Sequence, residues 1–138
     1  MNKQVLITGG SRGIGAATAR YLAGQGYHLC LNYRHDRASA EALLAEIRAQ
    51  HPVSCIAVQA DVSVEAEVVR LFEEMDARLG TITHLVNNAG ILLPQMRVLE
   101  MSAERINKTL TTNVTGYFLC CREAVRRMAP GGAIVNVS

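Results

Sequence analysis

The sequence predicts an α/β domain in which helices cover both faces of a doubly wound parallel sheet. Three observations lead to this prediction. Short apolar runs without alternating polar positions recur along the 138 residues, which is typical of strands buried on both faces. Segments with apolar residues at helical spacing lie between these runs, and glycine or proline marks most of the boundaries. Helices that alternate with strands in this way form right-handed crossovers between parallel strands.

The first strand is expected at Val5–Thr8, because a continuous apolar run there is followed by a glycine-rich turn. The helix after this turn is expected to end at Gly24 and Gly26, where the apolar period stops. A second strand is expected at residues 28–33. The apolar face of the helix is expected to carry Ile14, Ala17, Thr18, Tyr21 and Leu22.

The next two helices each have a serine that can cap the first turn. Ser39 is the expected cap of the second helix, which Pro52 ends before a third strand at residues 54–59. Ser63 is the expected cap of the third helix, which Gly80 ends. The inner face of the second helix is expected to carry Ala40, Leu43, Leu44 and Ile47. That of the third helix is expected to carry Val64, Val68, Leu71, Phe72, Met75 and Leu79.

A fourth strand is expected at Thr83–Asn87, followed by an apolar loop that contains Pro94. A long helical pattern then runs to Met128, and Pro130-Gly131-Gly132 ends it before a fifth strand. The apolar face of this long helix is expected to carry Leu110, Val114, Phe118, Cys121 and Val125.

The composition indicates a globular protein, with 49% hydrophobic and 19% charged residues. A net charge of +2 gives no support for nucleic acid or an anionic membrane as a partner. No apolar run approaches the ~20 residues of a membrane span, and no secretory signal is visible, so we expect a cytoplasmic protein. The four cysteines and four histidines are dispersed, which favours buried reduced thiols over a disulfide or a metal site.

The turn after the first strand, Thr8–Gly15, reads T-G-G-S-R-G-I-G. Glycine is needed where a chain turns tightly from strand to helix, and where its backbone approaches a pyrophosphate. The helix that follows offers unpaired N–H groups and a positive dipole end to phosphates. The spacing differs from G-x-G-x-x-G, and a purely structural turn would also explain these glycines.

Further motifs follow the strands at the same carboxyl edge of the predicted sheet. Asp61-Val62 follows the third strand, Asn87–Gly90 (N-N-A-G) ends the fourth, and Asn113-Val114 lies in the long helix. In this order, and with Thr8–Gly15, they resemble the motifs of the short-chain dehydrogenase/reductase family. The resemblance covers the whole chain. It implies a Rossmann-type fold with five of the family's strands, residues 1–138 forming an incomplete NADP(H)-binding domain.

The resemblance also implies roles for single residues. Asp61 would accept a hydrogen bond from the adenine amino group, the N-N-A-G motif would line the cofactor, and Asn113 would be the catalytic asparagine that supports a water in the proton relay. Structural alternatives remain: Asp61 as a turn former, Asn88 in a left-handed conformation, and Asn113 as the mark of a bend near Gly116. The expected cofactor-binding residues are Gly9, Ser11, Arg12, Gly13, Ile14, Gly15, Tyr33, Arg34, Asp61, Val62, Asn88, Ala89 and Gly90.

The charges near the second strand predict NADP(H) rather than NAD(H). Folds that prefer NAD place an acid at the end of this strand, where it binds the ribose 2′-OH and repels a 2′-phosphate. Here Tyr33 and Arg34 stand at that end, with Asp36 just beyond, and Arg12 in the glycine turn faces the same place. Two guanidinium groups suit a phosphate dianion, although both could be solvated surface charges.

Members of the family use a Tyr-x-x-x-Lys pair as acid and activator, and none of the four tyrosines here is followed by such a lysine. Relatives also carry a substrate-contacting serine in a motif similar to I-V-N-V-S-S. Ser138 aligns with the position before that serine, and neighbouring strand residues face opposite sides. We therefore expect an N-terminal part of a longer protein, and we expect these 138 residues alone to fold poorly and to be inactive.

The predicted function of the intact protein is hydride transfer between NADP(H) and a small carbonyl or alcohol substrate. Within the family, the sequence looks most like 3-oxoacyl-[acyl-carrier-protein] reductases and sugar dehydrogenases. The resemblance implies a homodimer or homotetramer for the complete chain. Two alternatives remain open: an inactive dinucleotide-binding sensor or regulatory module, and a degenerate product that is complete at this length.

Overall fold

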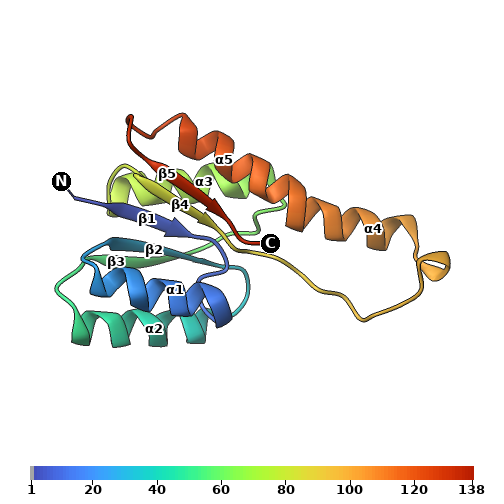
Figure 1. Cartoon of the computed structure of the whole chain (residues 1–138), viewed down its shortest axis with the longest axis horizontal. Coiled ribbons are helices and arrows are strands. Elements are labelled where there is room, and N and C mark those ends of the chain that lie inside the picture. Colours follow the sequence, from blue (N-terminus) through green and yellow to red (C-terminus); the bar gives the residue numbers. More distant parts are fainter. Residues whose placement is uncertain (1) are drawn as a thin grey trace.

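The computed structural model describes residues 2–138 and confirms the predicted fold class. Five parallel strands form one sheet in the order β3-β2-β1-β4-β5, with helices on both faces (Figure 1). The strands are β1 (Gln4–Ile7), β2 (His28–Tyr33), β3 (Cys55–Gln59), β4 (His84–Asn87) and β5 (Ala133–Asn136). The helices are α1 (Gly13–Gly24), α2 (Arg37–Gln50), α3 (Glu65–Arg78), α4 (Ala103–Leu110) and α5 (Gly116–Val125), with a 3₁₀ turn η1 (Val98–Glu100) and a π-helical turn η2 (Thr111–Thr115).

Strand β1 lies at the centre of the sheet and pairs with β2 on one side and β4 on the other. The chain therefore moves outward from β1 to β2 and β3, and then returns to place β4 and β5 on the opposite side. In open α/β sheets, the carboxyl ends of the strands on either side of such a reversal form a crevice that helices do not fill.

The sheet separates two cores, because successive strand residues point to opposite faces. Val5 and Ile7 of β1 pack with α1 and α2 on one face, whereas Leu6 packs with α3 and α5 on the other (Figure 1). The sequence predicted the inner faces of α2 and α3 well, except that Val64 precedes α3 and is 41% exposed. The buried residues are Ala40, Leu43, Leu44 and Ile47 in α2, and Val68, Leu71, Phe72 and Met75 in α3.

The predicted face of α1 is mostly wrong, although Leu22 packs against the core. Its buried residues are small, namely Gly15, Ala16, Ala19 and Ala23, while Ile14 and Tyr21 are 63% and 68% exposed. Small side chains let this helix approach the sheet closely, and a Cβ on Gly15 would lie only 2.4 Å from the Gly9 carbonyl oxygen. The close approach, rather than the largest apolar residues, therefore sets the orientation of α1.

Both predicted helix caps are also wrong, because an aspartate near each serine takes part instead. Asp36 is the N-cap of α2 and accepts hydrogen bonds from the Ser39 N–H (3.0 Å) and hydroxyl (2.7 Å). Asp61 likewise accepts from the N–H and hydroxyl of Ser63, in the turn before α3. Both aspartates thus hold the loops at the carboxyl edge of the sheet.

The long helical pattern forms α4, η2 and α5 without a break, and the π-turn contains Asn113. The predicted apolar face of α5 is mostly wrong: Cys121 packs against the core, but Phe118 and Val125 are 73% and 64% exposed. Instead, Gly116, Cys120, Glu123 and Ala124 are buried. Glu123 can be buried because it forms ion pairs with Arg122, Arg126 and Arg127, a tertiary effect that the apolar period could not reveal.

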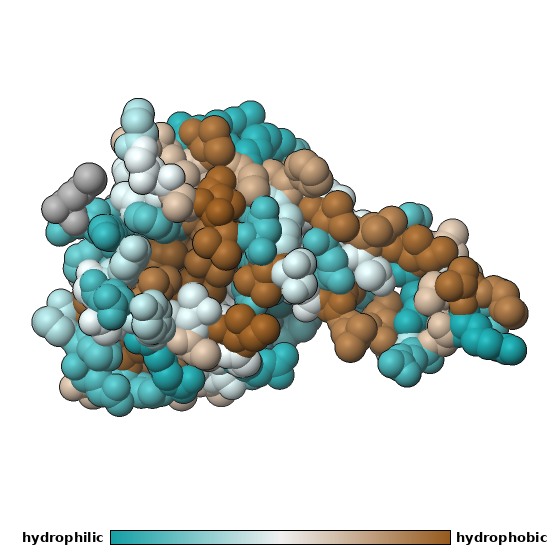
Figure 2. All heavy atoms as spheres, viewed as in Figure 1, coloured by the Kyte–Doolittle hydropathy of each residue, from teal (hydrophilic) through white to brown (hydrophobic). Residues whose placement is uncertain are grey.

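Brown spheres in Figure 2 mark apolar residues along the arm that carries α4 and the loop before it. Leu92, Val98 and Leu99 in this segment are each more than three-quarters exposed. No helix within residues 2–138 combines the length and the apolar character that crossing a membrane requires.

Candidate functional site

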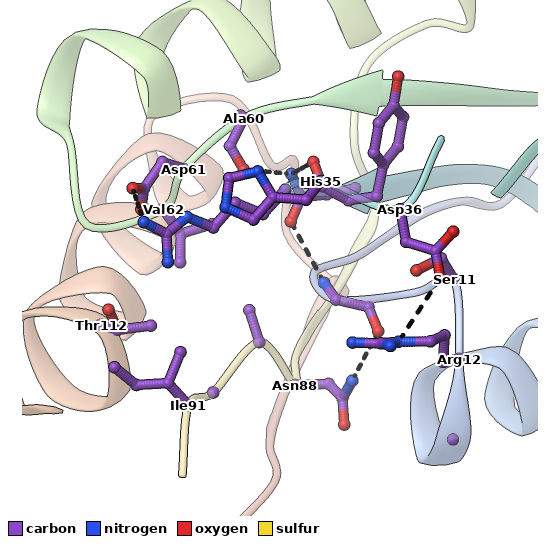
Figure 3. Close-up of a pocket in the computed structure, with 17 residues that line it drawn as sticks. Ser11, Arg12, His35, Asp36, Ala60, Asp61, Val62, Asn88, Ile91 and Thr112 are labelled. Atoms are coloured by element: carbon purple, nitrogen blue, oxygen red, sulfur yellow. Dashed lines mark hydrogen bonds and ion pairs between the residues drawn. The ribbon is translucent and has the colours of Figure 1, made fainter. Parts of the chain in front are cut away.

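A cleft of about 610 Å³ lies at the carboxyl ends of β1 to β4, where the strand order reverses. Figure 3 shows Ser11 and Arg12 on one side of it, and Asp61, Thr112 and Ile91 on the other. Its lining residues include Gly9, Ser11, Arg12, Gly13, Tyr33, Arg34, Asp61, Val62, Asn88, Ala89 and Gly90, all of which the sequence singled out. The structure thus brings most of the expected cofactor-binding residues together.

Three of the expected site residues do not line this cleft. Ile14 and Gly15 belong to the first turn of α1, where Gly15 packs against Gly9 and Asn88. Asn113 lines a separate cavity of about 190 Å³ between η2, α5 and the end of β5. It stays next to the main cleft, since a Cβ on Gly90 would lie 3.4 Å from its Oδ1.

The glycine turn has two positions that only glycine adopts without strain. Gly9 has φ +60°, and its backbone lies so close to Ala89 that a Cβ would be 3.0 Å from the Ala89 Cα. Gly13 has φ +55°, and a Cβ there would meet no atom within 4 Å. Gly13 therefore presents bare backbone to open space in the cleft, which is what close approach of a ligand to this loop requires.

The start of α1 has free hydrogen-bond donors. Arg12 is its N-cap residue and makes no side-chain cap. Within the described chain, no acceptor pairs with the N–H groups of Gly13, Ile14 or Gly15. Unpaired N–H groups and the positive end of the helix dipole make such a terminus suitable for a phosphate group.

The N-N-A-G motif holds the glycine turn in place through hydrogen bonds. The Asn88 side chain donates to the carbonyl oxygens of Thr8 (3.2 Å) and Gly9 (3.1 Å). The Thr8 hydroxyl accepts in return from the N–H groups of Asn88 and Ala89. The predicted alternative of a left-handed Asn88 is wrong, because no residue other than glycine has a positive φ in the described chain.

Each arginine of the cleft lies beside a carboxylate. Arg34 Nη2 is 3.2 Å from Asp61 Oδ2, and Arg12 Nε is 3.9 Å from Asp36 Oδ2. Partial burial raises the pKa of Asp61, but hydrogen bonds from Ser63 and the charges of Arg34 and His35 outweigh this, so its pKa lies below the usual value. The sequence placed these two arginines and two aspartates near one another, and the structure pairs each arginine with one aspartate.

Asn113 ties the π-turn to the loop after the N-N-A-G motif. Its Oδ1 accepts from the Ile91 N–H (2.8 Å), and its Nδ2 donates to the Ile91 carbonyl oxygen (3.0 Å). The N–H of Gly116 bonds to the Thr111 carbonyl oxygen five residues back, which makes η2 wider than an α-helical turn. Asn113 therefore lies at a local departure from α-helical geometry, and π-turns are frequent at functional sites.

The sequence missed several lining residues, among them Asn32 and Thr112. Asn32 is 2% exposed; its Oδ1 accepts from the Gly9 N–H, and its Nδ2 donates to the Ala60 carbonyl oxygen. Its signal was a lone polar residue in an apolar strand run. Thr112 had no signal beyond its position next to Asn113. The other additions are His35, Asp36, Ala60 and Ile91.

The cysteines do not contribute to this cleft. Cys30, Cys55 and Cys120 are buried, Cys121 is half-buried, and all four are free thiols. Burial raises the pKa of Cys30 and of Cys120 to about 12. Within residues 2–138, no group of three or more His, Cys, Asp or Glu side chains is arranged to hold a metal ion.

A family model described as short chain dehydrogenase matches residues 3–138. An uncharacterized oxidoreductase of Escherichia coli, YgfF, is 51% identical over an alignment of 138 positions that covers 96% of this chain and 56% of the relative. A 3-oxoacyl-[acyl-carrier-protein] reductase of Staphylococcus aureus, FabG, is 37% identical over 140 residues, covering 100% of this chain and 56% of the relative. The chain thus spans about half the length of the curated relatives it matches.

Solved structures of similar proteins agree with the fold. A short chain dehydrogenase from Burkholderia cenocepacia in complex with NADP superposes with a TM-score of 0.91 at 35% identity, covering 97% of this chain and 54% of that chain. A blue fluorescent protein from a metagenomic library, in complex with NADPH, gives a TM-score of 0.91 at 36% identity, with the same coverage.

Proposed function

The chain belongs to the short-chain dehydrogenase family, and we propose that residues 1–138 form the NADP(H)-binding domain of an oxidoreductase. The reaction would move a hydride between NADP(H) and a carbonyl or alcohol substrate. The observation that carries this proposal is the cleft at the strand reversal, which Arg12, Gly13 and Arg34 line and beside which the first N–H groups of α1 are unpaired. Its donors and its open glycine backbone fit a phosphorylated dinucleotide.

Each part of such a dinucleotide has a matching group in the chain. The start of α1 and the backbone at Gly13 would hold the pyrophosphate. Asp61 would accept from the adenine amino group, because Ser63 and Arg34 already keep its carboxylate charged and oriented. Bound NADP(H) would supply the hydride. The protein would bind and orient the cofactor and the substrate, and would exclude water.

We propose NADP(H) rather than NAD(H) for three reasons. The last residue of β2 is Tyr33, so no acid stands where the ribose 2′-OH would bind. Arg34 uses only Nη2 on Asp61, and its remaining donors can serve a phosphate without breaking this pair. Two solved relatives carry NADP or NADPH. Asp36 does not argue against this, because it caps α2 and lies beside Arg12.

Asn113 is proposed to act in proton transfer by positioning. Its two hydrogen bonds to Ile91 hold the π-turn against the loop that borders the cleft. The π-turn departs from the regular bonding of an α-helix, and we propose that a main-chain carbonyl oxygen at this turn accepts a hydrogen bond from the relay water. No tyrosine of this chain is followed by a lysine four residues later, so we still expect the 138 residues alone to show no reductase activity.

We also propose that the protein assembles as a homodimer or homotetramer. The outer face of α4, η2 and α5 carries apolar side chains that are about half exposed or more in the described chain, including Leu110, Val114 and Phe118. A large exposed apolar face is typical of an interaction surface. Sedimentation of the protein should give a species larger than a monomer, and a monomer at micromolar concentration would contradict this proposal.

The cofactor proposal is tested by equilibrium binding to the protein expressed from its own gene. We expect NADPH to bind more tightly than NADH. Because Arg34 also pairs with Asp61, Arg34→Asp weakens the adenine site that both dinucleotides share, but NADPH should lose at least about tenfold more affinity than NADH, since it alone loses a charge-assisted phosphate contact. Arg37→Asp is the matched control, because Arg37 is exposed and does not line the cleft. Equal or tighter binding of NADH by the unmodified protein would contradict the proposal.

The alternative of a dinucleotide sensor makes a different prediction. A sensor would bind NADPH but reduce no member of a panel of ketones, 3-oxoacyl thioesters and sugars. Turnover of any panel member by the protein from its own gene would exclude the sensor. The 3-oxoacyl thioesters belong in the panel because a relative at 37% identity is a 3-oxoacyl-[acyl-carrier-protein] reductase.

A further inference from the structure

Asn32 is a buried polar residue of β2 that no motif identified. It is only 2% exposed, and asparagine is depleted in strands. A buried side-chain amide is costly unless its oxygen and its nitrogen both find partners. Here both do: Oδ1 accepts from the Gly9 N–H at 3.2 Å, and Nδ2 donates to the Ala60 carbonyl oxygen at 3.0 Å.

These two partners belong to the two loops that would hold different parts of the dinucleotide. Gly9 lies in the glycine turn before α1, next to the place proposed for the pyrophosphate. Ala60 directly precedes Asp61 in the loop of residues 60–63, the adenine loop, which would bind the amino group of the base. Within residues 2–138, no other side chain hydrogen-bonds to both loops, so the Asn32 amide is what joins them directly.

Each loop also has hydrogen bonds of its own. The Gly9 carbonyl oxygen accepts from the Asn88 side chain at 3.1 Å, on the side of β4. In the adenine loop, the Asp61 carboxylate accepts from the N–H and the hydroxyl of Ser63. Loss of the Asn32 amide would therefore leave both loops folded while removing the bonds that fix one loop relative to the other.

We propose that Asn32 is a positioning residue of the cofactor site, whose amide sets the separation of the glycine turn and the adenine loop so that one dinucleotide contacts both. This inference rests on the proposed function of the cleft. Asn32 acts through Gly9 and Ala60, because almost none of its own surface is open to a ligand. A ligand that contacts both loops gains from this preorganisation, whereas a ligand that contacts only one of them does not.

Equilibrium binding of two ligands to the protein expressed from its own gene tests this role. NADPH would contact both loops, whereas adenosine 2′-monophosphate has no pyrophosphate and would contact only the adenine loop and the cleft arginines. Asn32→Leu keeps the approximate size of the side chain and removes both hydrogen bonds. NADPH should therefore bind about tenfold more weakly, while the affinity for adenosine 2′-monophosphate should stay within about twofold.

A second variant and a control separate positioning from stability. Asn32→Thr suits a strand and keeps a hydroxyl group for one partner, so NADPH should lose about threefold in affinity. Asn136→Leu is the matched control: Asn136 also forms a side-chain hydrogen bond between strands, at 3.0 Å to Asn87, but it does not line the cleft. Its urea midpoint should fall and its NADPH affinity should not change.

The outcomes distinguish this inference from the proposed function. Equal weakening of both ligands by folded Asn32 variants would show a general loosening of the cleft and overturn the inference, as would an equal loss of NADPH affinity in Asn136→Leu. No binding of adenosine 2′-monophosphate at millimolar concentration would also overturn it, because the adenine loop would then not be formed on its own. If the unmodified protein binds no dinucleotide, the proposed function fails. If it binds NADPH and both Asn32 variants bind it equally well, only this inference fails.

Discussion

The packing at Gly15 makes a prediction in which one chemical change has opposite effects at two places in the same helix. A Cβ at Gly15 would lie 2.4 Å from the Gly9 carbonyl oxygen and 2.7 Å from Asn88 Nδ2. Neither group can move freely, because Asn88 holds the glycine turn through two hydrogen bonds. At Gly24, the C-terminal residue of α1, the nearest atom would be His51 Cε1 at 3.8 Å, which is ordinary contact.

The magnitudes follow from two opposing terms. Alanine is favoured over glycine in a helix by up to about 1 kcal/mol. Overpacking against immobile atoms costs about 3 kcal/mol, at the upper end of what core substitutions show. Gly15→Ala should therefore lower the free energy of unfolding by about 2 kcal/mol, whereas Gly24→Ala should raise it by up to about 1 kcal/mol.

Both changes are measured by urea unfolding of the two variants and the unmodified protein, followed by circular dichroism. Gly15→Ala should also bind NADPH more weakly. A Gly15→Ala protein as stable as the unmodified one, with unchanged NADPH affinity, would refute the idea that this contact sets the position of α1. Gly24→Ala tests the helix-propensity term alone. If it destabilised the protein as much as Gly15→Ala, the expected gain from helix propensity would be wrong.

Two further predictions concern α5 and the π-turn. Burial raises the pKa of Glu123, but hydrogen bonds from Arg127 and Arg122 and the nearby charges outweigh this effect, so the folded-state pKa is lowered. The carboxylate therefore contributes stability above its unfolded pKa of about 4.3, and this contribution is lost as the pH falls through the lower folded pKa. Glu123→Gln should lower the free energy of unfolding by about 1–2 kcal/mol at pH 7. The urea midpoint of the variant should also fall less steeply as the pH is lowered, and an unchanged dependence on pH would contradict the prediction. Asn113→Ala removes both hydrogen bonds to Ile91, so it should lower the free energy of unfolding by about 1–2 kcal/mol and speed hydrogen exchange of the Ile91 amide. Asn107→Ala is the control, because Asn107 is exposed. Unchanged exchange of the Ile91 amide would show that other contacts hold the loop.

The strands and the inner faces of α2 and α3 could be predicted from the sequence because their buried residues are also their largest apolar ones. Leu43 and Ile47 in α2, and Leu71 and Phe72 in α3, are buried as their spacing predicts. The same reasoning fails for α1, where alanine and glycine are buried. A period of large apolar residues identifies a core face only if the packing distance leaves room for them.

The faces of α5 show a second limit of the apolar period. Phe118 interrupts no pattern in the sequence, yet it is exposed, and the buried Glu123 looks like a surface residue. Burial of Glu123 depends on three arginines, of which Arg127 also pairs with Asp76 of α3. Such a network forms only in the folded state, so no local pattern in the sequence indicates it.

The candidate site likewise combines residues that could be predicted with contacts that could not. Motif residues such as Gly9 and Asn88 could be predicted because their backbone conformation or bonding to a turn permits few other residue types. The ion pairs of Arg12 with Asp36 and of Arg34 with Asp61 could not, because each joins two loops at neighbouring strand ends. The sequence indicated which charges are present at the cleft, and only the fold showed how they are paired.

Asn32 shows why this cleft is suited to its proposed ligand. It lies on β2, and its amide bonds to Gly9 on the loop after β1 and to Ala60 after β3, while Asn88 holds Gly9 from the side of β4. The glycine turn is therefore fixed from both sides by side chains that are already in place. The entropy of ordering this loop is lost during folding and not during association, which favours tight binding of a ligand at this turn.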